Sequence, residues 1–193
     1  MLKLYLILSL ATVTFNIKAL HRDIRGKQSL RMFDCTAVYI SPTEALTAAH
    51  CVRNASNYMW IHDDSANKSY SAEVIYADPQ HDLALITAPR ATNRPFANLG
   101  TGVVRMDPIY TYNSGDGIPG NWNQGIVSNL IIDPDTNTHQ ILHTASILSG
   151  ASGSGLFDKK GHLIGINTMT QGAMAYAVDI SEIRAFLAIA RAF

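Results

Sequence analysis

The sequence predicts an all-β protein that ends in a single α-helix, on three observations. The chain has 193 residues, enough for one ordinary domain or two small lobes that share a core. Beyond residue 19, short apolar and β-branched runs alternate with turn residues, a pattern typical of β-sandwiches and β-barrels. The third observation is a helical period at the end of the chain. We expect strands at 36–40, 45–47, 72–76, 82–87, 102–105, 125–128, 140–144, 156–157, 163–167 and 174–178.

The helix is predicted from Ser181 onward. Apolar residues recur at helical spacing there, among them Ile183, Phe186 and Leu187. Ser181 is a residue type that caps helix starts, so we expect it to cap this one. The stretch 90–101 has no clear period and is expected to join two lobes.

Composition and charge exclude two classes of protein. Hydrophobic residues make up 47% of the chain and charged residues 16%, which is typical of a globular protein and not of a disordered one. The formal net charge is zero, and no stripe of Lys and Arg is present. Nucleic-acid binding is therefore not predicted.

Residues 1–19 have the pattern of a secretory signal peptide. Lys3 supplies a positive start, the run 4–17 is mostly apolar, and Ala19 is a small residue at a plausible cleavage point. A transmembrane anchor is the alternative, but this run is shorter than the ~20 residues that a spanning helix needs. We expect a mature chain of residues 20–193, secreted or periplasmic, without stable membrane insertion.

The chain has two cysteines, Cys35 and Cys51. In an oxidising compartment a disulfide between them is the expected state. A metal site is the alternative, but no C-x-x-C spacing and no nearby pair of histidines supports it. Asp133 resembles the start of a calcium loop, yet Thr138 replaces the glycine that such a loop needs, so a hairpin turn is expected. We expect no metal and no cofactor, and surface or packing roles for the remaining histidines.

Two segments offer a general base and a residue to orient it. His50 lies in 47–51, Thr-Ala-Ala-His-Cys, where small neighbours would let its ring point into a cleft. Asp82 opens the apolar run 83–86, where a buried carboxylate is costly unless a partner offsets its charge. A bond to an imidazole N–H would fix the tautomer of a catalytic histidine. A solvent-exposed Asp at a strand edge is the alternative.

The glycine-rich segment 149–155 offers a nucleophile. Its glycines permit tight turns with positive φ, which can aim successive N–H groups at a developing oxyanion. Ser152 stands at the apex as the candidate nucleophile, and Ser154 is the alternative. A phosphate-binding loop is not supported, because no Gly-Lys-Ser/Thr follows, and a flexible linker is not expected between two apolar strands. The three segments together supply the groups that acyl transfer by covalent catalysis needs.

These motifs resemble the chymotrypsin-like serine proteases. The segment 47–51, the chain order His, Asp, Ser and the 16-residue separation of the cysteines all match that family. The resemblance covers about residues 33–190. In the second half, 125–128, 149–155 and 161–167 are most similar to the HtrA and glutamyl-endopeptidase branches. HtrA proteins usually carry a C-terminal peptide-binding domain, which we do not expect here.

The resemblance implies two antiparallel six-stranded β-barrels of the trypsin type, with a C-terminal helix. The first barrel is expected at about 20–95, and the second, with the helix, at about 96–193. The catalytic site is expected in the cleft between them.

The resemblance also implies roles for individual residues. His50 is the general base, Asp82 orients it, and Ser152 is the nucleophile, while the N–H groups of Gly150 and Ser152 form the oxyanion hole. Cys35 and Cys51 correspond to the histidine-loop disulfide of the family. Thr168 stands where the family often has a Ser near the buried Asp. Residues 168–170 are expected to pair with a peptide substrate as an edge strand.

Several positions depart from well-known branches of this family. Ala151 replaces the Asp that in trypsin binds the new N-terminus, so no activation salt bridge of that kind is expected. Ser146 stands at the pocket floor, where a neutral residue does not favour Lys or Arg. Asn167 replaces the His of glutamyl endopeptidases, which argues against strong Glu preference. Thr170 and Met174 would narrow the pocket, so we expect a small or medium uncharged residue before the scissile bond.

The sequence therefore predicts a secreted serine endopeptidase that acts on protein or peptide substrates through an acyl-enzyme. A catalytically silent trypsin-fold binding protein is one alternative, and the presence of all three triad residues argues against it. An esterase for small acyl esters is another. Its G-x-S-x-G strand–turn–helix setting is not predicted, because a strand follows Ser152.

Overall fold

The computed structural model describes residues 4, 11–22, 28–53, 55–63, 68–87, 95–118 and 120–192. Strands account for most of these residues. In chain order the elements are β1 (Thr12–Arg22), β2 (Gln28–Tyr39), β3 (Glu44–Thr47), α2 (Ala49–Val52), β4 (Ala55–Asp63), β5 (Lys68–Ala72), β6 (Val74–Asp78), β7 (Leu83–Thr87), β8 (Pro108–Asn113), the 3-10 helix η1 (Gly115–Gly117), β9 (Asn121–Ile132), β10 (His139–His143), β11 (Gly155–Phe157), β12 (Leu163–Gln171), β13 (Met174–Asp179) and α3 (Ile180–Ala190).

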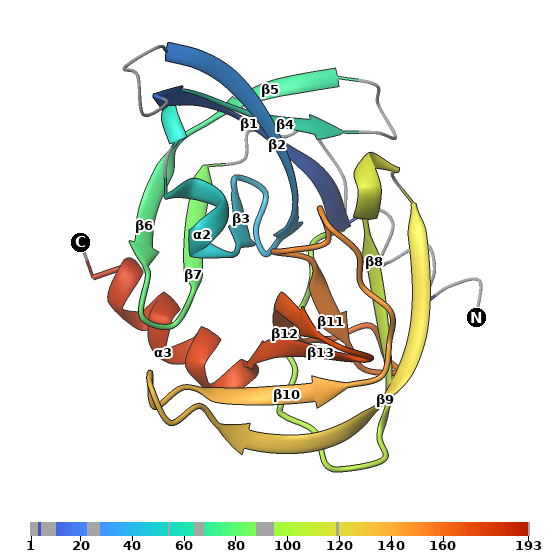
Figure 1. Ribbon diagram of the computed structural model, residues 1–193. Helices are drawn as coiled ribbons and strands as arrows, with labels where there is room; N and C mark the ends of the chain where they lie inside the picture. Colours follow the sequence, from blue (N-terminus) through green and yellow to red (C-terminus); the bar gives the residue numbers. More distant parts are fainter. Residues whose placement is uncertain are drawn as a thin grey trace.

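The strands form two antiparallel sheets, one in each half of the chain (Figure 1). Strands β1 to β7 form a seven-stranded sheet in the order β5-β4-β1-β2-β3-β7-β6. Strands β8 to β13 form a closed barrel in the order β10-β13-β12-β11-β8-β9. The terminal helix α3 packs against β12 and β13 of the barrel and against β6 and β7 of the sheet. The prediction of a mostly β fold with a C-terminal helix is confirmed, as is one six-stranded barrel.

The second predicted six-stranded barrel is not confirmed. Among the described residues the first half is a seven-stranded sheet, and its two edge strands, β5 and β6, are consecutive in the chain. Glu73 alone separates them, and it pairs with Thr87 of β7: the Glu73 N–H donates to Thr87 Oγ1 at 2.8 Å, and Thr87 N–H donates to the Glu73 carbonyl at 2.8 Å. The predicted single strand 72–76 is therefore broken at this residue. Such a break depends on pairing with a distant strand, which a local pattern does not encode.

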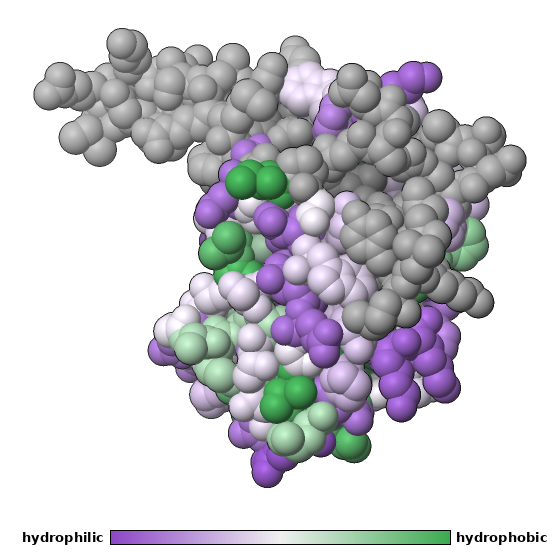
Figure 2. Space-filling view, turned by 90° about the vertical axis from the view of Figure 1, so that its right-hand side faces the viewer, coloured by the Kyte–Doolittle hydropathy of each residue, from purple (hydrophilic) through white to green (hydrophobic). Residues whose placement is uncertain are grey.

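One hydrophobic core cluster is shared by the two halves, beside clusters that belong to the sheet or to the barrel alone. Buried leucines of the sheet, Leu46, Leu83 and Leu85, belong to the same cluster as Phe157 of the barrel and Phe186 of α3. Burial of apolar side chains is the main favourable term in folding, so this shared core fixes the halves against each other. On the face shown in Figure 2, the coloured apolar side chains form small groups separated by polar ones.

Strand β12 changes character along its length. Residues 163–168 are buried, whereas Met169, Thr170 and Gln171 are exposed. These last three residues still pair with β13, so β12 continues beyond the core as an exposed ribbon. This end of β12 is where residues 168–170 are predicted to meet a peptide.

Two local predictions were wrong. The cap of α3 is Asp179, whose Oδ1 accepts hydrogen bonds from Ser181 N at 2.8 Å and Ser181 Oγ at 2.6 Å. Ser181 therefore donates to the capping side chain and does not cap the helix itself. The Asp179 carboxylate is a better hydrogen-bond acceptor than the Ser181 hydroxyl. The expected strand 102–105 is an irregular segment and turn, since Gly102 has φ 113° and Met106 has φ 72°, and the strand begins at Pro108.

The predicted signal peptide overlaps strand β1. Residues 1–3 and 5–10 of that prediction lie outside the described residues, whereas Thr12–Arg22 pairs with β2 on one side and β4 on the other. Cleavage after Ala19 would leave only residues 20–22 of this strand. The signal peptide stays a prediction. In the part of the chain that the structure describes, no helix is long and apolar enough to cross a membrane.

Candidate active site

His50 lies on α2, a single helical turn that follows β3. Three of the four residues of this turn, Ala49, Cys51 and Val52, are buried, while His50 is exposed. The Ala49 N–H donates to the Asp82 carbonyl at 3.1 Å, which holds the start of α2 against the turn that precedes β7. Small neighbours allow this close packing and leave the imidazole at the surface.

Asp82 binds His50 through both of its carboxylate oxygens. Oδ2 accepts from the ring Nδ1 at 2.8 Å, and Oδ1 accepts from the His50 backbone N–H at 2.8 Å. Because a carboxylate only accepts, Nδ1 carries the proton, and Nε2 of the neutral ring is left with its lone pair. Asp82 has φ 52°, a left-handed conformation that Asp tolerates better than most residues. Its side chain is 29% exposed, so the expected deep burial is not found.

Ser152 lies in the connection between β10 and β11, which reaches from the barrel to the sheet. The Ser152 carbonyl accepts from Thr36 N on β2 at 2.8 Å and lies 3.9 Å from Cys51 Sγ. Cys51 adjoins His50, so the same contacts bring Ser152 to the element that carries the imidazole. The Ser152 hydroxyl donates to the Thr168 carbonyl at 3.2 Å, and among the described residues no hydrogen bond joins it to His50.

The predicted disulfide is present. Cys35 on β2 and Cys51 on α2 are joined, which ties the histidine turn to the strand that contacts Ser152. The sulfur atoms and His50 lie at metal-ligand spacing, but both sulfurs are committed to the disulfide. They therefore offer no thiolate to a metal ion.

The segment before Ser152 is held in an unusual backbone conformation. Gly150 has φ 90°, and a Cβ at this position would lie 2.9 Å from the Ser114 carbonyl, so glycine is required twice over. The Ser149 carbonyl accepts from Asp116 N at 2.5 Å. The carbonyl and the following N–H of a trans peptide point in opposite directions, so the Gly150 N–H points away from Asp116. Among the described residues, the N–H groups of Gly150 and Ser152 have no acceptor.

The residues predicted to bind substrate divide into two sets. The Thr168 carbonyl contacts the Ser152 hydroxyl, and Thr170 is exposed two residues farther along β12. Ser146 is exposed in the connection that follows β10. The Thr168 hydroxyl donates to the Tyr176 carbonyl at 3.4 Å rather than contacting Asp82. Contact of these residues with a substrate stays a prediction.

Asn167 has a different environment from the one predicted. It is fully buried, and its amide nitrogen donates to Ser154 Oγ at 2.8 Å and to Thr111 Oγ1 at 3.2 Å. Its amide oxygen accepts from His143 Nε2 at 2.8 Å. The side chain is thus bonded inside the barrel. Ser154, the alternative nucleophile, is fully buried in the same network, which argues against a catalytic role for it.

His143 contrasts with His50. It is fully buried, and this burial lowers its pKa from 6.5 to about 4, although the bond to Asn167 acts in the opposite direction. His143 is therefore neutral at physiological pH. Local sequence pattern gave no sign of this burial.

A cavity of about 430 Å³ opens beside His50 and Asp82. One wall is the turn between β6 and β7, and the facing walls are the hairpin between β9 and β10 and the exposed end of β12, represented by Gln80, Thr136 and Met169. The cavity therefore lies where the two halves meet, directly next to the imidazole.

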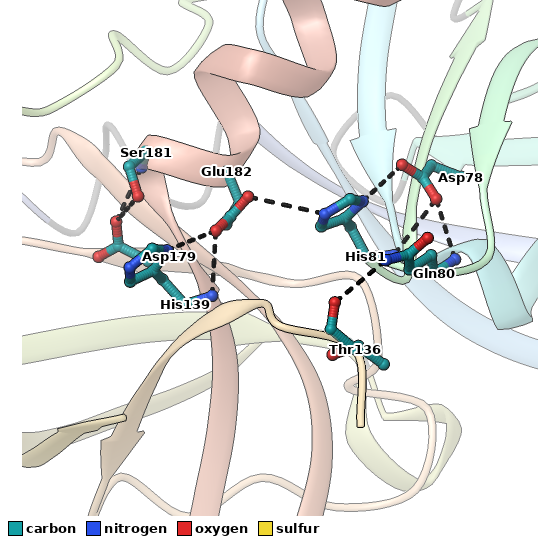
Figure 3. Close-up of polar contacts among 8 residues, drawn as sticks. All are labelled: Asp78, Gln80, His81, Thr136, His139, Asp179, Ser181 and Glu182. Atoms are coloured by element: carbon teal, nitrogen blue, oxygen red, sulfur yellow. Dashed lines mark hydrogen bonds and ion pairs between the residues drawn. The ribbon is translucent and has the colours of Figure 1, made fainter. Parts of the chain in front are cut away.

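Imidazole–carboxylate contacts link the turn that carries Asp82 to the barrel and to α3 (Figure 3). His81 Nδ1 donates to Asp78 Oδ2 at 2.6 Å, and His81 Nε2 lies 3.8 Å from Glu182 Oε2. His139 Nδ1 donates to Glu182 Oε1 at 2.6 Å. Burial alone would raise the pKa of Glu182, but hydrogen bonds from His139 and the charges on both histidines outweigh it and lower the pKa. Sequence reasoning missed this set, because its members come from three distant segments.

The profile of the trypsin-like peptidase domain matches residues 35–166, which hold all three candidate catalytic residues. The chain belongs to this family. Among curated relatives of this trypsin-like peptidase is the magnetosome formation protease MamE of Paramagnetospirillum magneticum, 31% identical over 155 residues, or 74% of this chain and 21% of that protein. The MamE of Magnetospirillum gryphiswaldense is 29% identical over 154 residues, 73% of this chain and 20% of that protein. The chain thus spans about a fifth of the length of these relatives.

Solved structures of an HtrA-type protease share the fold of this trypsin-like peptidase. The structure of HtrA-type protease AlgWS227A with a decapeptide has a TM-score of 0.87 and 19% identity, covering 96% of this chain and 66% of that chain. The structure with a tripeptide has a TM-score of 0.81 and 21% identity, covering 94% and 60%. The resemblance to trypsin-fold proteases near the HtrA branch is confirmed.

Proposed function

We propose that this trypsin-like peptidase is a serine endopeptidase with a triad of Ser152, His50 and Asp82. The observation that carries the proposal is the contact between Asp82 Oδ2 and His50 Nδ1 at 2.8 Å, which directs the basic Nε2 away from the carboxylate. Ser152 supports it, because its carbonyl is bonded to Thr36 and packed against Cys51, next to the imidazole.

The reaction proceeds by two acyl transfers. Ser152 Oγ bonds to the carbonyl carbon of the substrate while His50 Nε2 takes the hydroxyl proton, and the N–H groups of Gly150 and Ser152 stabilise the resulting oxyanion. His50 then gives this proton to the amine as the C–N bond breaks. Water repeats the sequence on the acyl-enzyme and releases the acid.

The first step requires the Ser152 hydroxyl to leave the Thr168 carbonyl. The hydroxyl turns about the Cα–Cβ bond of Ser152 toward His50 and exchanges one neutral hydrogen bond, worth about 1 kcal/mol net, for another. A peptide strand that pairs with 168–170 would supply an N–H to the Thr168 carbonyl. Substrate binding would thereby release the nucleophile.

A peptide substrate suits the surroundings of this site. Among the described residues, the exposed end of β12 pairs with β13 alone, and the cavity of about 430 Å³ beside His50 can accept side chains of an extended chain. The decapeptide and tripeptide named with the HtrA-type structures support this class of ligand. The neutral Ser146 and the bulk of Thr170 favour a small or medium uncharged residue before the scissile bond. A library profile dominated by Arg, Lys or Glu would contradict that preference.

We also propose that the protein works outside the cytoplasm, as a secreted or periplasmic protein. The disulfide between Cys35 and Cys51 supports an oxidising compartment. The leader pattern of residues 1–19 supplies the route of export.

The test is labelling of the purified protein with a fluorophosphonate. Wild type is expected to label, and Ser152→Ala and His50→Ala are expected not to, while Ser154→Ala labels normally. A folded wild type that does not label would favour a catalytically silent binding protein. In such a protein the Ser152 hydroxyl would stay bonded to the Thr168 carbonyl and would not act as a nucleophile. Labelling with hydrolysis of small esters and no cleavage of any library peptide would favour an esterase.

A further inference from the structure

Thr36 on β2 contacts both ends of the segment that carries the two proposed oxyanion donors. Its hydroxyl donates to the Gly150 carbonyl at 2.9 Å, and its backbone N–H donates to the Ser152 carbonyl at 2.8 Å. The residue is fully buried. One residue of the sheet therefore bonds two peptide groups of the loop that the barrel contributes.

The direction of the Thr36 hydroxyl is itself fixed. Its oxygen accepts from Ser114 N at 3.2 Å, so the hydroxyl both donates and accepts. The Thr36 carbonyl accepts from Thr47 Oγ1 at 2.9 Å, which holds the backbone of β2 at this point. Threonine has a stiff χ1 torsion, and burial leaves this side chain no alternative partner in solvent.

These bonds restrain the peptide groups on either side of Gly150. The peptide before it is held through the Ser149 carbonyl by Asp116 N, and the peptide after it is held through the Gly150 carbonyl by the Thr36 hydroxyl. A glycine with φ 90° otherwise has wide conformational freedom. A flip of the peptide before Gly150 would turn the Gly150 N–H away from the site. The peptide after Gly150 carries the Ala151 N–H, which donates to the Leu148 carbonyl at 2.9 Å, so a flip there would break both this bond and the bond from Thr36 and would disturb the backbone between the two donors.

The side chain of the residue between the two donors makes no polar contact, and its backbone N–H closes a local turn by donating to the Leu148 carbonyl at 2.9 Å. Ala151 is fully buried, and its methyl group cannot make the ion pair that the corresponding Asp of trypsin makes with a new N-terminus. The loop must therefore be held by other groups.

We propose that Thr36 is the positioning residue of the oxyanion hole. Its hydroxyl holds Gly150 so that the Gly150 and Ser152 N–H groups converge, a task that in trypsin depends on a cleaved N-terminus. This inference rests on the proposed function, and it adds a constraint that the triad does not imply: the donors are set by a hydroxyl of the opposite sheet and need no new N-terminus.

The test compares Thr36→Val with Thr36→Ser. Valine keeps the shape and the backbone bond to Ser152 but removes the hydroxyl, whereas serine retains it. Loss of one oxyanion donor lowers kcat by about 10²–10³-fold, so partial misorientation in Thr36→Val should lower kcat by about 10–100-fold with KM unchanged. Thr36→Ser should restore most of kcat.

Thr87→Val is the matched control. It also removes a threonine hydroxyl that bonds a backbone group of the same sheet, the Glu73 N–H at 2.8 Å, but Thr87 lies at the end of β7 farthest from Asp82. We expect both valine variants to lose similar stability in thermal melts and only Thr36→Val to lose kcat. An equal loss of kcat in both would overturn the inference, because it would assign the effect to packing.

A second readout is independent of how much protein is folded. A tripeptide aldehyde ending in alanine forms a tetrahedral adduct with serine, and the matching tripeptide acid does not. Thr36→Val should lose affinity for the aldehyde and keep its affinity for the acid, whereas partial unfolding would weaken both equally. If wild type labels with fluorophosphonate and Thr36→Val retains the full aldehyde preference, the positioning role is wrong. If wild type does not label, the proposed function itself fails.

Discussion

The two halves of the molecule complete their sheets in different ways. In the second half, six strands form a closed barrel in which each strand is hydrogen-bonded to a neighbour on both sides; β9, for example, pairs with β8 and with β10. In the first half, the two edges of the sheet are successive parts of one segment, 68–78, which changes partner from β4 to β7 at Glu73. The first half also places β1 between β2 and β4.

This difference matters because the chemistry is divided between the halves. The barrel contributes Ser152, and the less regular sheet contributes His50, Asp82 and the bonds from Thr36 that hold the serine loop. Integrity of the sheet should therefore govern catalysis as strongly as integrity of the barrel that carries the nucleophile.

The largest expected effect tests whether the halves act as one catalytic unit. Ser152→Ala and His50→Ala should each lower kcat by about 10⁴-fold or more, and the double variant should be no slower than the slower single variant, because neither group works without the other. If the loss of kcat for peptide hydrolysis in the double variant equalled the product of the two single losses, Ser152 and His50 would not act in one shared mechanism.

The next prediction concerns pH dependence, in which the buried His143 of the barrel should differ from the exposed His50 of the sheet. In the unfolded chain His143 has a pKa of 6.5, whereas burial in the folded protein lowers this pKa to about 4. As the pH falls from 6.5 to 4, the unfolded chain takes up the proton first, so the folded protein loses stability over this range. The full window corresponds to about 3 kcal/mol. His143→Gln should flatten the dependence of unfolding free energy on pH between these values, measured with urea, and an unchanged slope would refute it.

A smaller effect concerns the contacts between the halves around Glu182. Glu182→Gln should lower the unfolding free energy at pH 7 by up to about 1 kcal/mol, since His139 is largely solvent-exposed. The pKa of Glu182 is lowered in the folded state, so its contribution is complete above the unfolded pKa and is lost as pH falls through the folded one. Glu73→Gln, at an exposed residue, is the control. The difference in unfolding free energy between Glu182→Gln and wild type should disappear in acid, whereas Glu73→Gln should stay close to wild type throughout.

The smallest effect concerns the mature N-terminus. Export with removal of residues 1–19 should give a protein that begins at Leu20 and still labels with fluorophosphonate. Loss of most of β1 should leave the amides of Met59–His62 on β4 less protected from hydrogen exchange than those of β10, because these residues pair with β1. N-terminal sequencing that finds a start before Thr12 would show the leader prediction to be wrong and β1 to be intact.

The site residues that could be predicted from the sequence are those that lie in short, recognisable motifs. His50, Asp82 and Ser152 each stood out within a few residues of their own neighbours. The disulfide was expected because the chain carries two cysteines and a leader pattern, and the family resemblance implied the same pairing. Thr36 carried no such signal, since a β-branched residue in a strand is ordinary. The burial of Asn167 was equally hidden, because β12 is buried continuously from Leu163 to Thr168 and not at alternate residues.

The sequence by itself determined the residue types that the chemistry needs, their order and the mostly β character of the chain, because motifs and hydrophobic periodicity are local properties. Only the tertiary structure decided that the first sheet has seven strands, that His143 and Asn167 face the interior, and that Thr36 holds Gly150. Each of these depends on pairing and packing between residues far apart in the chain, and the free energy of such contacts exists only once the fold has brought them together.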